Sequence, residues 1–159
     1  MSDAAAMLTE AANQGHMLAQ ATIGDFFLSG VGVVQDLDQA FEFTTKAAQK
    51  GHAPSQYNLG IMYRNGYGTP PSSQDANTWF LKATEQEYFT AYSALAESHL
   101  HGWGTPPNIK RAVELYKLGA AHGSHQSFTS LYKVSNLYEA GRVGRPCLTS
   151  SSSLSSIPR

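Results

Sequence analysis

The stretch NGYGTPP at residues 65–71 returns almost unchanged as HGWGTPP at residues 101–107. A loop with two glycines either cradles a phosphate group or marks a turn within a repeated structural unit. A phosphate loop follows a β-strand, and one class continues with Lys-Ser or Lys-Thr. Here Thr-Pro-Pro follows the glycines, and the residues before each loop have helical spacing. Because the C-terminal end of a helix carries partial negative charge, which repels phosphate, we interpret both loops as turns of a repeat.

The interval between the two loops, 36 residues, extends along most of the chain. It also separates matching small residues, namely Gly30, Gly66 and Gly102, Gly32, Gly68 and Gly104, and Ala40, Ala76 and Ala112. A fixed period of about 20–50 residues indicates a solenoid of stacked units. We predict one domain over residues 1–144, which consists of a half repeat at 3–14, whole repeats at 15–50, 51–86 and 87–122, and a partial repeat at 123–144.

The partial repeat matches the others only after a shift. The sequence SLYKVSNLYEAG at 130–141 aligns with SQYNLGIMYRNG at 55–66 once SFT at 127–129 is treated as an insertion of three residues. In this alignment Tyr132 is the counterpart of Tyr57.

The first half of each repeat is predicted to form a helix, called helix A. Within 53–66, Leu59, Gly60 and Tyr63 have the spacing of one helical face. The small residue in the middle lets a neighbouring helix approach closely, although glycine lowers helix propensity. Helix A ends at Gly66, because glycine suits the left-handed position after a helix and the following Pro-Pro prevents an early restart.

The second half of each repeat is predicted to form helix B, which starts at one of three preferred N-cap residues, Asp36, Ser72 and Asn108. Gln39 is expected to complete a capping-box pair with the first of them. Helix B runs to about residues 49, 86 and 121, and its apolar face in the second repeat consists of Ala76, Trp79 and Ala83. Each unit is then an antiparallel helical hairpin, and the fold class is all-α.

The unit resembles the Sel1-like repeat, a relative of the tetratricopeptide repeat. The resemblance rests on LGIMYRNGYG at 59–68 and DANTWFLKATEQ at 75–86, with further copies at 23–51 and looser ones at 95–123. It implies a right-handed α/α solenoid that serves as a scaffold or adaptor and does no chemistry. In that family such modules act in protein degradation at the endoplasmic reticulum, in signalling and in chitin-synthase regulation. Some secreted bacterial members link each hairpin by a disulfide, which this chain with its single Cys147 cannot do.

The composition restricts the class of protein further. The 159-residue chain has a formal net charge of −1, which excludes the basic surface that nucleic-acid binding requires. No stretch reaches the ~18 consecutive apolar residues of a membrane helix, and the first residues lack the pattern of a signal peptide. We predict no nucleic-acid partner, no membrane insertion and a cytoplasmic location.

The histidines and the cysteine give no pattern typical of a metal or catalytic site. His99 and His101 end a helix A, whereas His122 and His125 follow the end of a helix B, at the opposite pole of the hairpin. A helix of ~13 residues separates the two pairs by roughly 20 Å, too far to share one ion. Cys147 lies in a serine-rich stretch with no histidine partner. We predict no metal site, no cofactor and no enzymatic activity.

The remaining candidate for function is a surface on helix A. Positions 57, 61 and 64 form a second stripe, roughly 120° from the first. In the families that the sequence resembles, this stripe lines a concave groove that binds peptides or partner domains. Its members are Ala21, Asp25 and Leu28, then Tyr57, Ile61 and Arg64, then Ser93, Glu97 and Leu100, and finally Tyr132, Asn136 and Glu139. Their mixture of aromatic, aliphatic and charged groups suits another protein or peptide as the partner.

The two ends of the chain suggest alternatives. Residues 145–159 are rich in serine, lack a helical period and are predicted to form a disordered tail. The repeats start and stop within a unit, whereas a solenoid needs capping units at its ends. One hypothesis is a structural fragment of a longer array with its binding site elsewhere, and another is end-to-end self-association. A hydrolase-type activity, claimed for some relatives in the family, is a further alternative to the scaffold.

Overall fold

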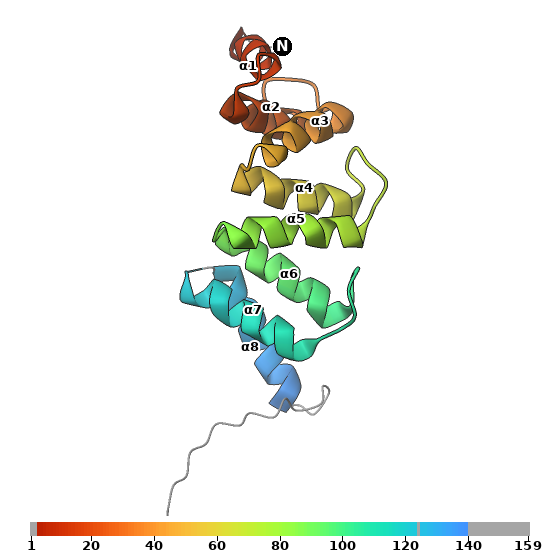
Figure 1. The fold of residues 1–159 in the computed structure, drawn as a ribbon, viewed down its shortest axis with the longest axis vertical. Helices are drawn as coiled ribbons and strands as arrows, with labels where there is room; N and C mark the ends of the chain where they lie inside the picture. Colours follow the sequence, from red (N-terminus) through yellow and green to blue (C-terminus); the bar gives the residue numbers. More distant parts are fainter. Residues whose placement is uncertain (1–2, 124, 140–159) are drawn as a thin grey trace, which may run out of the picture.

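The computed structural model describes residues 3–123 and 125–139, so the predicted tail and Cys147 lie outside the described residues. This part of the chain contains eight helices and no strand. Figure 1 shows the helices stacked one after another along the longest axis of the molecule. They are α1 (Asp3–Asn13), α2 (Met17–Ser29), α3 (Leu37–Gln49), α4 (Ala53–Asn65), α5 (Ser73–Glu85), α6 (Phe89–His101), α7 (Ile109–Ala121) and α8 (His125–Glu139).

Helices A and B alternate along this stack. The A helices, α2, α4, α6 and α8, begin at residues 17, 53, 89 and 125, so every unit keeps the 36-residue period. The B helices, α3, α5 and α7, begin at residues 37, 73 and 109. Helix α1 precedes the first A helix and therefore holds the place of a B helix. The predicted all-α solenoid of antiparallel hairpins is confirmed.

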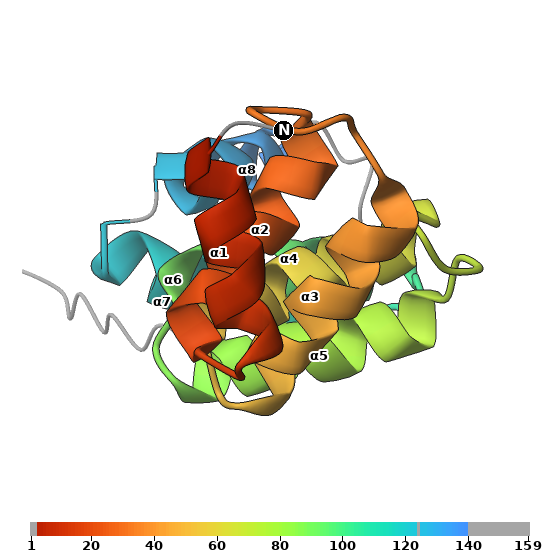
Figure 2. The same cartoon turned by 90° about the horizontal axis from the view of Figure 1, so that it is seen from above.

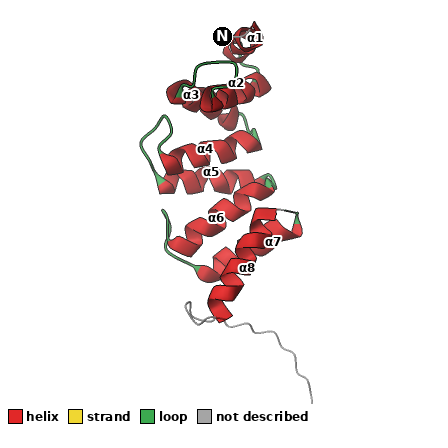
Figure 3. Ribbon diagram, turned by 180° about the vertical axis from the view of Figure 1, so that it is seen from behind, coloured by secondary structure: helices red, strands yellow, loops and turns green. Residues whose placement is uncertain are grey.

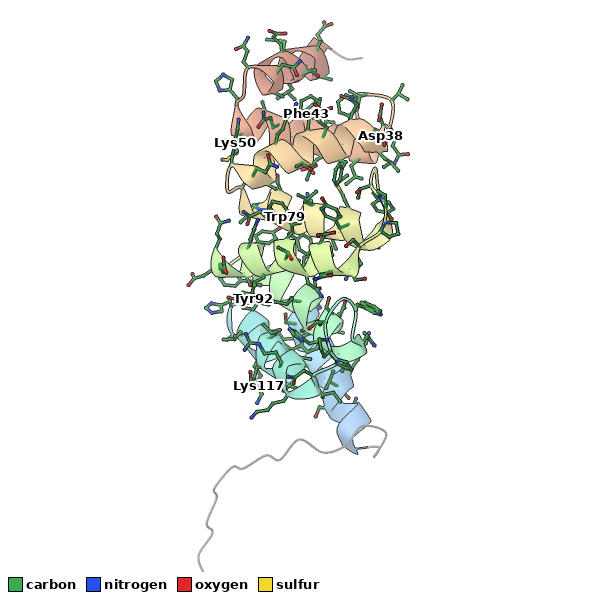
Figure 4. All side chains as sticks on the ribbon, turned by 45° about the vertical axis from the view of Figure 1, so that its right-hand side comes forward. Asp38, Phe43, Lys50, Trp79, Tyr92 and Lys117 are labelled. Atoms are coloured by element: carbon green, nitrogen blue, oxygen red, sulfur yellow. The ribbon has the colours of Figure 1, made fainter. Side chains whose placement is uncertain are left out.

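The loops inside the hairpins and the turns between repeats lie at opposite edges of the stack. In Figure 4, Asp38 at the start of α3 lies at one edge, whereas Lys50 and Tyr92, beside the turns between repeats, lie at the other. The α4–α5 and α6–α7 loops project on the same side in Figure 3. Seen from above, the successive helices overlap around one axis (Figure 2).

Each hairpin loop has the glycine and the cap that the sequence predicts. In the α4–α5 loop, Gly66 has a left-handed φ of 76°, and its N–H donates to the Met62 carbonyl at 2.8 Å. The Ser72 hydroxyl accepts a hydrogen bond from the Asp75 N–H at 3.2 Å and so caps α5. The other two loops repeat the arrangement with Gly30 and Asp36, and with Gly102 and Asn108.

The capping box predicted for Gln39 is wrong. The Gln39 side chain was expected to accept a hydrogen bond from the Asp36 N–H. This N–H donates instead to the Phe27 carbonyl at 3.0 Å. The same backbone bond joins Ser72 to Tyr63 at 2.8 Å. The loop therefore folds back onto the helix A before it, and this contact uses the donor that a capping box needs.

The second glycine of the α4–α5 and α6–α7 loops packs against the preceding repeat. Gly68 has a φ of 65°, and a Cβ at this position would overlap the carbonyl oxygen of Leu37, at the start of α3 in the preceding repeat. A Cβ on Gly104 would lie 2.6 Å from the Ser73 carbonyl oxygen at the start of α5. Both the backbone conformation and the close approach require glycine.

The core runs between the helices of each hairpin and depends on small residues in helix A. A Cβ on Gly60 would lie 2.5 Å from the ring of Phe80, which is fully buried in α5. Gly24 approaches Thr44 of α3 in the same way. Trp79, predicted for the buried face of α5, is only half-buried, and the next residue, Phe80, fills the core in its place.

A hydrogen bond recurs at three successive joints between repeats. At each joint a side chain in the first turn of helix A donates to a backbone carbonyl near the end of the preceding helix B. The bonds are Gln20 Nε2 to the Ala12 oxygen at 3.0 Å, Gln56 Nε2 to the Ala48 oxygen at 3.2 Å, and the Tyr92 hydroxyl to the Thr84 oxygen at 3.1 Å. The corresponding residue in α8 is Phe128, which has no donor in its side chain and is 55% exposed.

The three-residue shift predicted for the partial repeat is absent at the start of α8. This helix begins at His125, 36 residues after α6 begins at Phe89, and residues 127–129 lie inside it. Ser127 and Val134 are buried, as are Ala91 and Ser98 at the same positions of α6. The additional residues lengthen the helix, which has 15 residues where the other A helices have 13.

Candidate functional site

Arg64 and Glu97, two residues of the predicted groove, meet between neighbouring A helices. The Arg64 guanidinium in α4 lies 3.4 Å from the Glu97 carboxylate in α6. Their side chains are 25% and 29% exposed, so the pair is neither sealed in the core nor free in solvent. The Arg64 guanidinium also lies over the Phe80 ring, 5.7 Å from its centroid. It is therefore held in position from two sides.

A pocket opens beside this pair. It has a volume of about 460 Å³ and is lined by Arg64, Asn65, Ser73, Glu97 and Trp103. These residues come from the end of α4, the first turn of α5, the middle of α6 and the α6–α7 loop. The hairpin loop that packs on the preceding repeat through Gly104 thus also supplies one wall of the pocket.

Trp103 is the aromatic wall of the pocket. Its side chain is 43% exposed and stacks on His101, with the ring centroids 4.7 Å apart. The Trp103 carbonyl accepts a hydrogen bond from Asn77 Nδ2 at 2.6 Å, which fixes this part of the loop against α5. The groove prediction did not include Trp103, although it stands between the two glycines of the repeated loop. Asn65 and Ser73 were not predicted either.

Tyr57 and Ile61, the other α4 residues of the predicted groove, pack against the hydrophobic core. The Tyr57 ring lies 5.8 Å from Phe80 and 5.7 Å from Tyr88, centroid to centroid. Burial raises the pKa of the Tyr57 hydroxyl above its usual value. Ile61 is partly buried against the hydrophobic core cluster that includes Phe80, Leu95 and Tyr116. Both side chains are thus committed in large part to packing, and truncating either one would disturb the fold.

Asp25 lies on the corresponding part of α2. Its carboxylate accepts a hydrogen bond from Asn58 Nδ2 of α4 at 3.0 Å, so it links two A helices as Arg64 and Glu97 do. Burial raises the pKa of the Asp25 carboxyl group, and the bond from Asn58 and the nearby His52 partly offset this effect. Polar side chains thereby join three successive A helices, α2, α4 and α6.

The α8 members of the predicted groove do not line the pocket. In the observed 36-residue register, Thr129, Lys133 and Asn136 hold the positions that Ser93, Glu97 and Leu100 hold in α6. Tyr132 instead matches Ala96, and its side chain is 70% exposed. Asn136 is exposed, and the side chain of Glu139 lies outside the described residues.

Two titratable groups of α6 and α7 lie near the pocket residues. Burial, followed by the charge of Glu97, raises the pKa of the Tyr116 hydroxyl to about 12, and a hydrogen bond with Ser130 partly offsets this rise. Burial, followed by the charge of Arg111, lowers the pKa of His99.

Within residues 3–123 and 125–139, no three His, Cys, Asp or Glu side chains gather closely enough to hold a metal ion. In the same part of the chain, no helix is both long and apolar enough to span a membrane.

The sequence matches the family model of the Sel1 repeat at residues 18–52, 53–88 and 90–124. This chain therefore belongs to the Sel1 repeat family, whose members are in general non-enzymatic scaffolds for protein–protein interaction. No curated protein matches the chain at a significant level.

Several solved structures are similar to the fold. A protective antigen of uropathogenic Escherichia coli with an SLR fold has a TM-score of 0.78 and 28% identity, over 86% of this chain and 29% of the antigen. A Sel1 repeat protein from Oxalobacter formigenes has a TM-score of 0.78 and 26% identity, over 88% of this chain and 56% of that protein. Cysteine-rich protein B of Helicobacter pylori shares the fold, with a TM-score of 0.61 and 21% identity over 79% of this chain and 90% of that protein. The chain thus spans less than two thirds of the first two proteins.

Proposed function

We propose that this chain is a non-enzymatic adaptor that binds an extended segment of a partner protein across α4 and α6. The observation that carries the proposal is the partly exposed Arg64–Glu97 pair at a pocket that Trp103 also lines. Arginine and tryptophan are the residue types that most often dominate the energy of a protein interface. A rigid stack of hairpins holds them at a fixed separation, so a partner meets a surface that is already organised.

The chemistry of the pocket suits a polypeptide. Arg64, Asn65 and Ser73 provide hydrogen-bond donors, whereas Glu97, Asn65 and Ser73 provide acceptors. An extended peptide presents both kinds of group along its backbone. The bond to Glu97 uses one of the five N–H groups of the Arg64 guanidinium, which leaves others for a partner carbonyl or carboxylate. The volume of about 460 Å³ lies within the usual range of ligand pockets, ~300–1,000 Å³.

The predicted groove residues then divide into two roles. Arg64 and Glu97, together with Trp103, contact the partner, whereas Tyr57 and Ile61 pack against the core and stabilise the fold of α4. Asp25 extends the polar face onto α2. In this proposal Tyr132, Asn136 and Glu139 are not part of the pocket, and a partner reaches them only if its segment continues onto α8.

Selection of a displayed random-peptide library on the full chain tests the proposal. Peptides that bind the wild-type chain are expected to bind Arg64→Gln and Trp103→Ala at least about tenfold more weakly, as hot-spot residues require. Arg111→Gln is the matched control, because Arg111 forms an exposed pair with Glu114 at 3.2 Å on α7 and does not line the pocket. Equal affinity for wild type, Arg64→Gln and Trp103→Ala would contradict the proposal.

A purely structural role within a longer array is the second candidate. It is favoured by one observation, that the chain spans only 29% and 56% of the first two similar structures. Under this alternative the library yields no peptide whose binding depends on Arg64 or Trp103. The same selection therefore distinguishes the two functions.

A further inference from the structure

The last residue of α4, Asn65, is followed by Gly66, and this is the only Asn-Gly pair among the 159 residues of the chain. Asn65 is exposed and lines the pocket together with Arg64. In the other two hairpins the residue before the same glycine is Ser29 or His101, so neither carries a side-chain amide there. A side-chain amide followed by glycine therefore occurs only at the pocket.

An Asn-Gly pair is chemically labile, because it can lose ammonia without a catalyst. The Gly66 backbone nitrogen gives its proton to a base in the solvent and attacks Cγ of Asn65. A bond forms between this nitrogen and Cγ, and the bond from Cγ to the side-chain nitrogen breaks, so that the side-chain nitrogen takes up a proton and leaves as ammonia. Water then opens the cyclic succinimide at either carbonyl carbon and gives aspartate or isoaspartate. Glycine favours the attack because it has no side chain to obstruct the approach.

The native structure restrains this reaction by hydrogen bonds at the end of α4. The Gly66 N–H donates to the Met62 carbonyl at 2.8 Å, which holds the proton on the attacking nitrogen. The Tyr67 N–H donates to the same carbonyl at 2.9 Å. Both bonds lie beside the exposed Asn65. Helix ends open at a much smaller free-energy cost than the whole fold, so these bonds break without global unfolding.

We propose that Asn65 is a site of spontaneous deamidation, which the native chain reaches by opening of the last turn of α4, and whose products close the pocket to a partner segment. The modification needs only water and a base from the solvent, so it does not depend on the proposed adaptor function. Its effect on a partner does rest on that function.

Both products change the pocket in ways that oppose binding. Aspartate puts a second carboxylate into the pocket, where it competes with Glu97 and with a partner for the donors of the Arg64 guanidinium. Isoaspartate routes the backbone through the side chain and so adds a carbon atom between α4 and its loop. That loop packs against the preceding repeat through Gly68. The polar lining of the pocket and the position of the loop are therefore both altered.

Mass spectrometry of the full chain, aged in mildly alkaline buffer, tests the proposal. The native chain is expected to convert Asn65 before any other asparagine, such as Asn58, which is followed by leucine. Conversion is expected to be roughly tenfold slower than in the urea-unfolded chain, because a helix end opens at a small free-energy cost. Fragment spectra that separate isoaspartate from aspartate should show both products. Asn65→Gln is the matched control, because its longer side chain does not close the same ring.

Low concentrations of urea distinguish local opening from global unfolding. Local opening predicts a conversion rate that stays nearly constant as urea is added. Reaction from the globally unfolded chain predicts a rate that rises with urea and that, without urea, is at least about a thousandfold below the rate of the unfolded chain. A rate of this second kind, or conversion of another asparagine ahead of Asn65 in the native chain, overturns the proposal.

The variant Asn65→Asp reproduces one product and measures its effect on the pocket. Peptides selected on the wild-type chain are expected to bind Asn65→Asp at least about fivefold more weakly than Asn65→Gln, because only the first substitution adds a charge. Equal affinities would overturn the closure of the pocket. The mass spectra need no peptide, so failure of the adaptor proposal is distinguishable from failure of this one.

Discussion

Gly68, in the loop of the second hairpin, packs so closely against Leu37, the first residue of α3 in the first hairpin, that a Cβ at Gly68 would overlap the Leu37 carbonyl group. The same contact joins Gly104 to Ser73 one repeat later. The two glycines of the repeated Gly-x-Gly motif therefore have different structural roles. Its first glycine ends helix A in the left-handed conformation, and its second glycine lets the loop rest on the preceding repeat.

Replacement of Gly68 by alanine is expected to lower the free energy of unfolding by more than 2 kcal/mol, roughly, because left-handed strain adds to a backbone overlap. Gly51→Ala is the matched variant. Gly51 also has a positive φ, of 89°, but no atom lies within 4 Å of a Cβ placed there. It should lose only about 1 kcal/mol from strain. Urea unfolding followed by circular dichroism measures both values, and equal losses would contradict the role given to Gly68.

Glu87→Gly is expected to stabilise the fold. Glu87 has a φ of 58°, whereas the same position in the other turns between repeats is Gly15, Gly51 or Gly123. Glycine removes a strain of ~1–2 kcal/mol but adds entropy to the unfolded chain, so a net gain of about 0.5–1 kcal/mol is expected. The urea midpoint should rise with an unchanged slope. A lower midpoint would show that the Glu87 side chain matters more than its backbone conformation.

Tyr92→Phe tests the hydrogen bond that recurs at the joints. The substitution removes only the hydroxyl group that donates to the Thr84 carbonyl at 3.1 Å. A loss of about 1 kcal/mol in the free energy of unfolding is expected. Tyr67→Phe is the control, because Tyr67 is 39% exposed in the α4–α5 loop. If the two variants lost the same amount, the bond to Thr84 would not stabilise the joint.

His99 is expected to make stability depend on pH. Burial, and then Arg111, lowers its pKa in the folded chain below the ordinary value of 6.5. The unfolded chain therefore binds the proton more readily, so the contribution of neutral His99 is complete above pH 6.5 and is lost as the pH falls through the folded pKa. His99→Phe, which places the residue found at Phe27 in α2, should lose less stability on acidification than the wild type. Unfolding curves at several pH values measure the difference, and identical curves would contradict this role.

The local features of the fold could be predicted from the sequence because each depends on a few neighbouring residues. Gly66 and Ser72 mark a helix end and a helix start whatever packs around them. The capping box predicted at Gln39 is absent because the Asp36 N–H donates to the Phe27 carbonyl on the other side of the hairpin loop, a contact that residue types alone do not reveal. The register predicted for α8 was wrong because tyrosines recur at more than one position of the repeat, whereas the burial of Ser127 and Val134 shows that the start of α8 keeps the 36-residue register.

The candidate site was predictable only in part for the same reason. The helical stripe placed Arg64 and Glu97 on one face, and the structure shows that they meet. Trp103 was not predicted as a pocket residue because the sequence alone does not tell where a loop folds relative to the next helix. The loop reaches the pocket through the fit of Gly104 on α5, which is a contact between repeats.

The central claim, that a partner segment binds at the Arg64–Glu97 pocket, is tested most directly by the two tryptophan indole N–H signals in an NMR titration. The chain has only two tryptophans, Trp103 at the pocket and Trp79 on α5, where Lys82 covers its ring at 3.9 Å. Titration with a peptide selected from the library is predicted to shift the Trp103 signal and leave the Trp79 signal in place. A shift of Trp79 alone, or of neither signal at saturating peptide, would contradict the account.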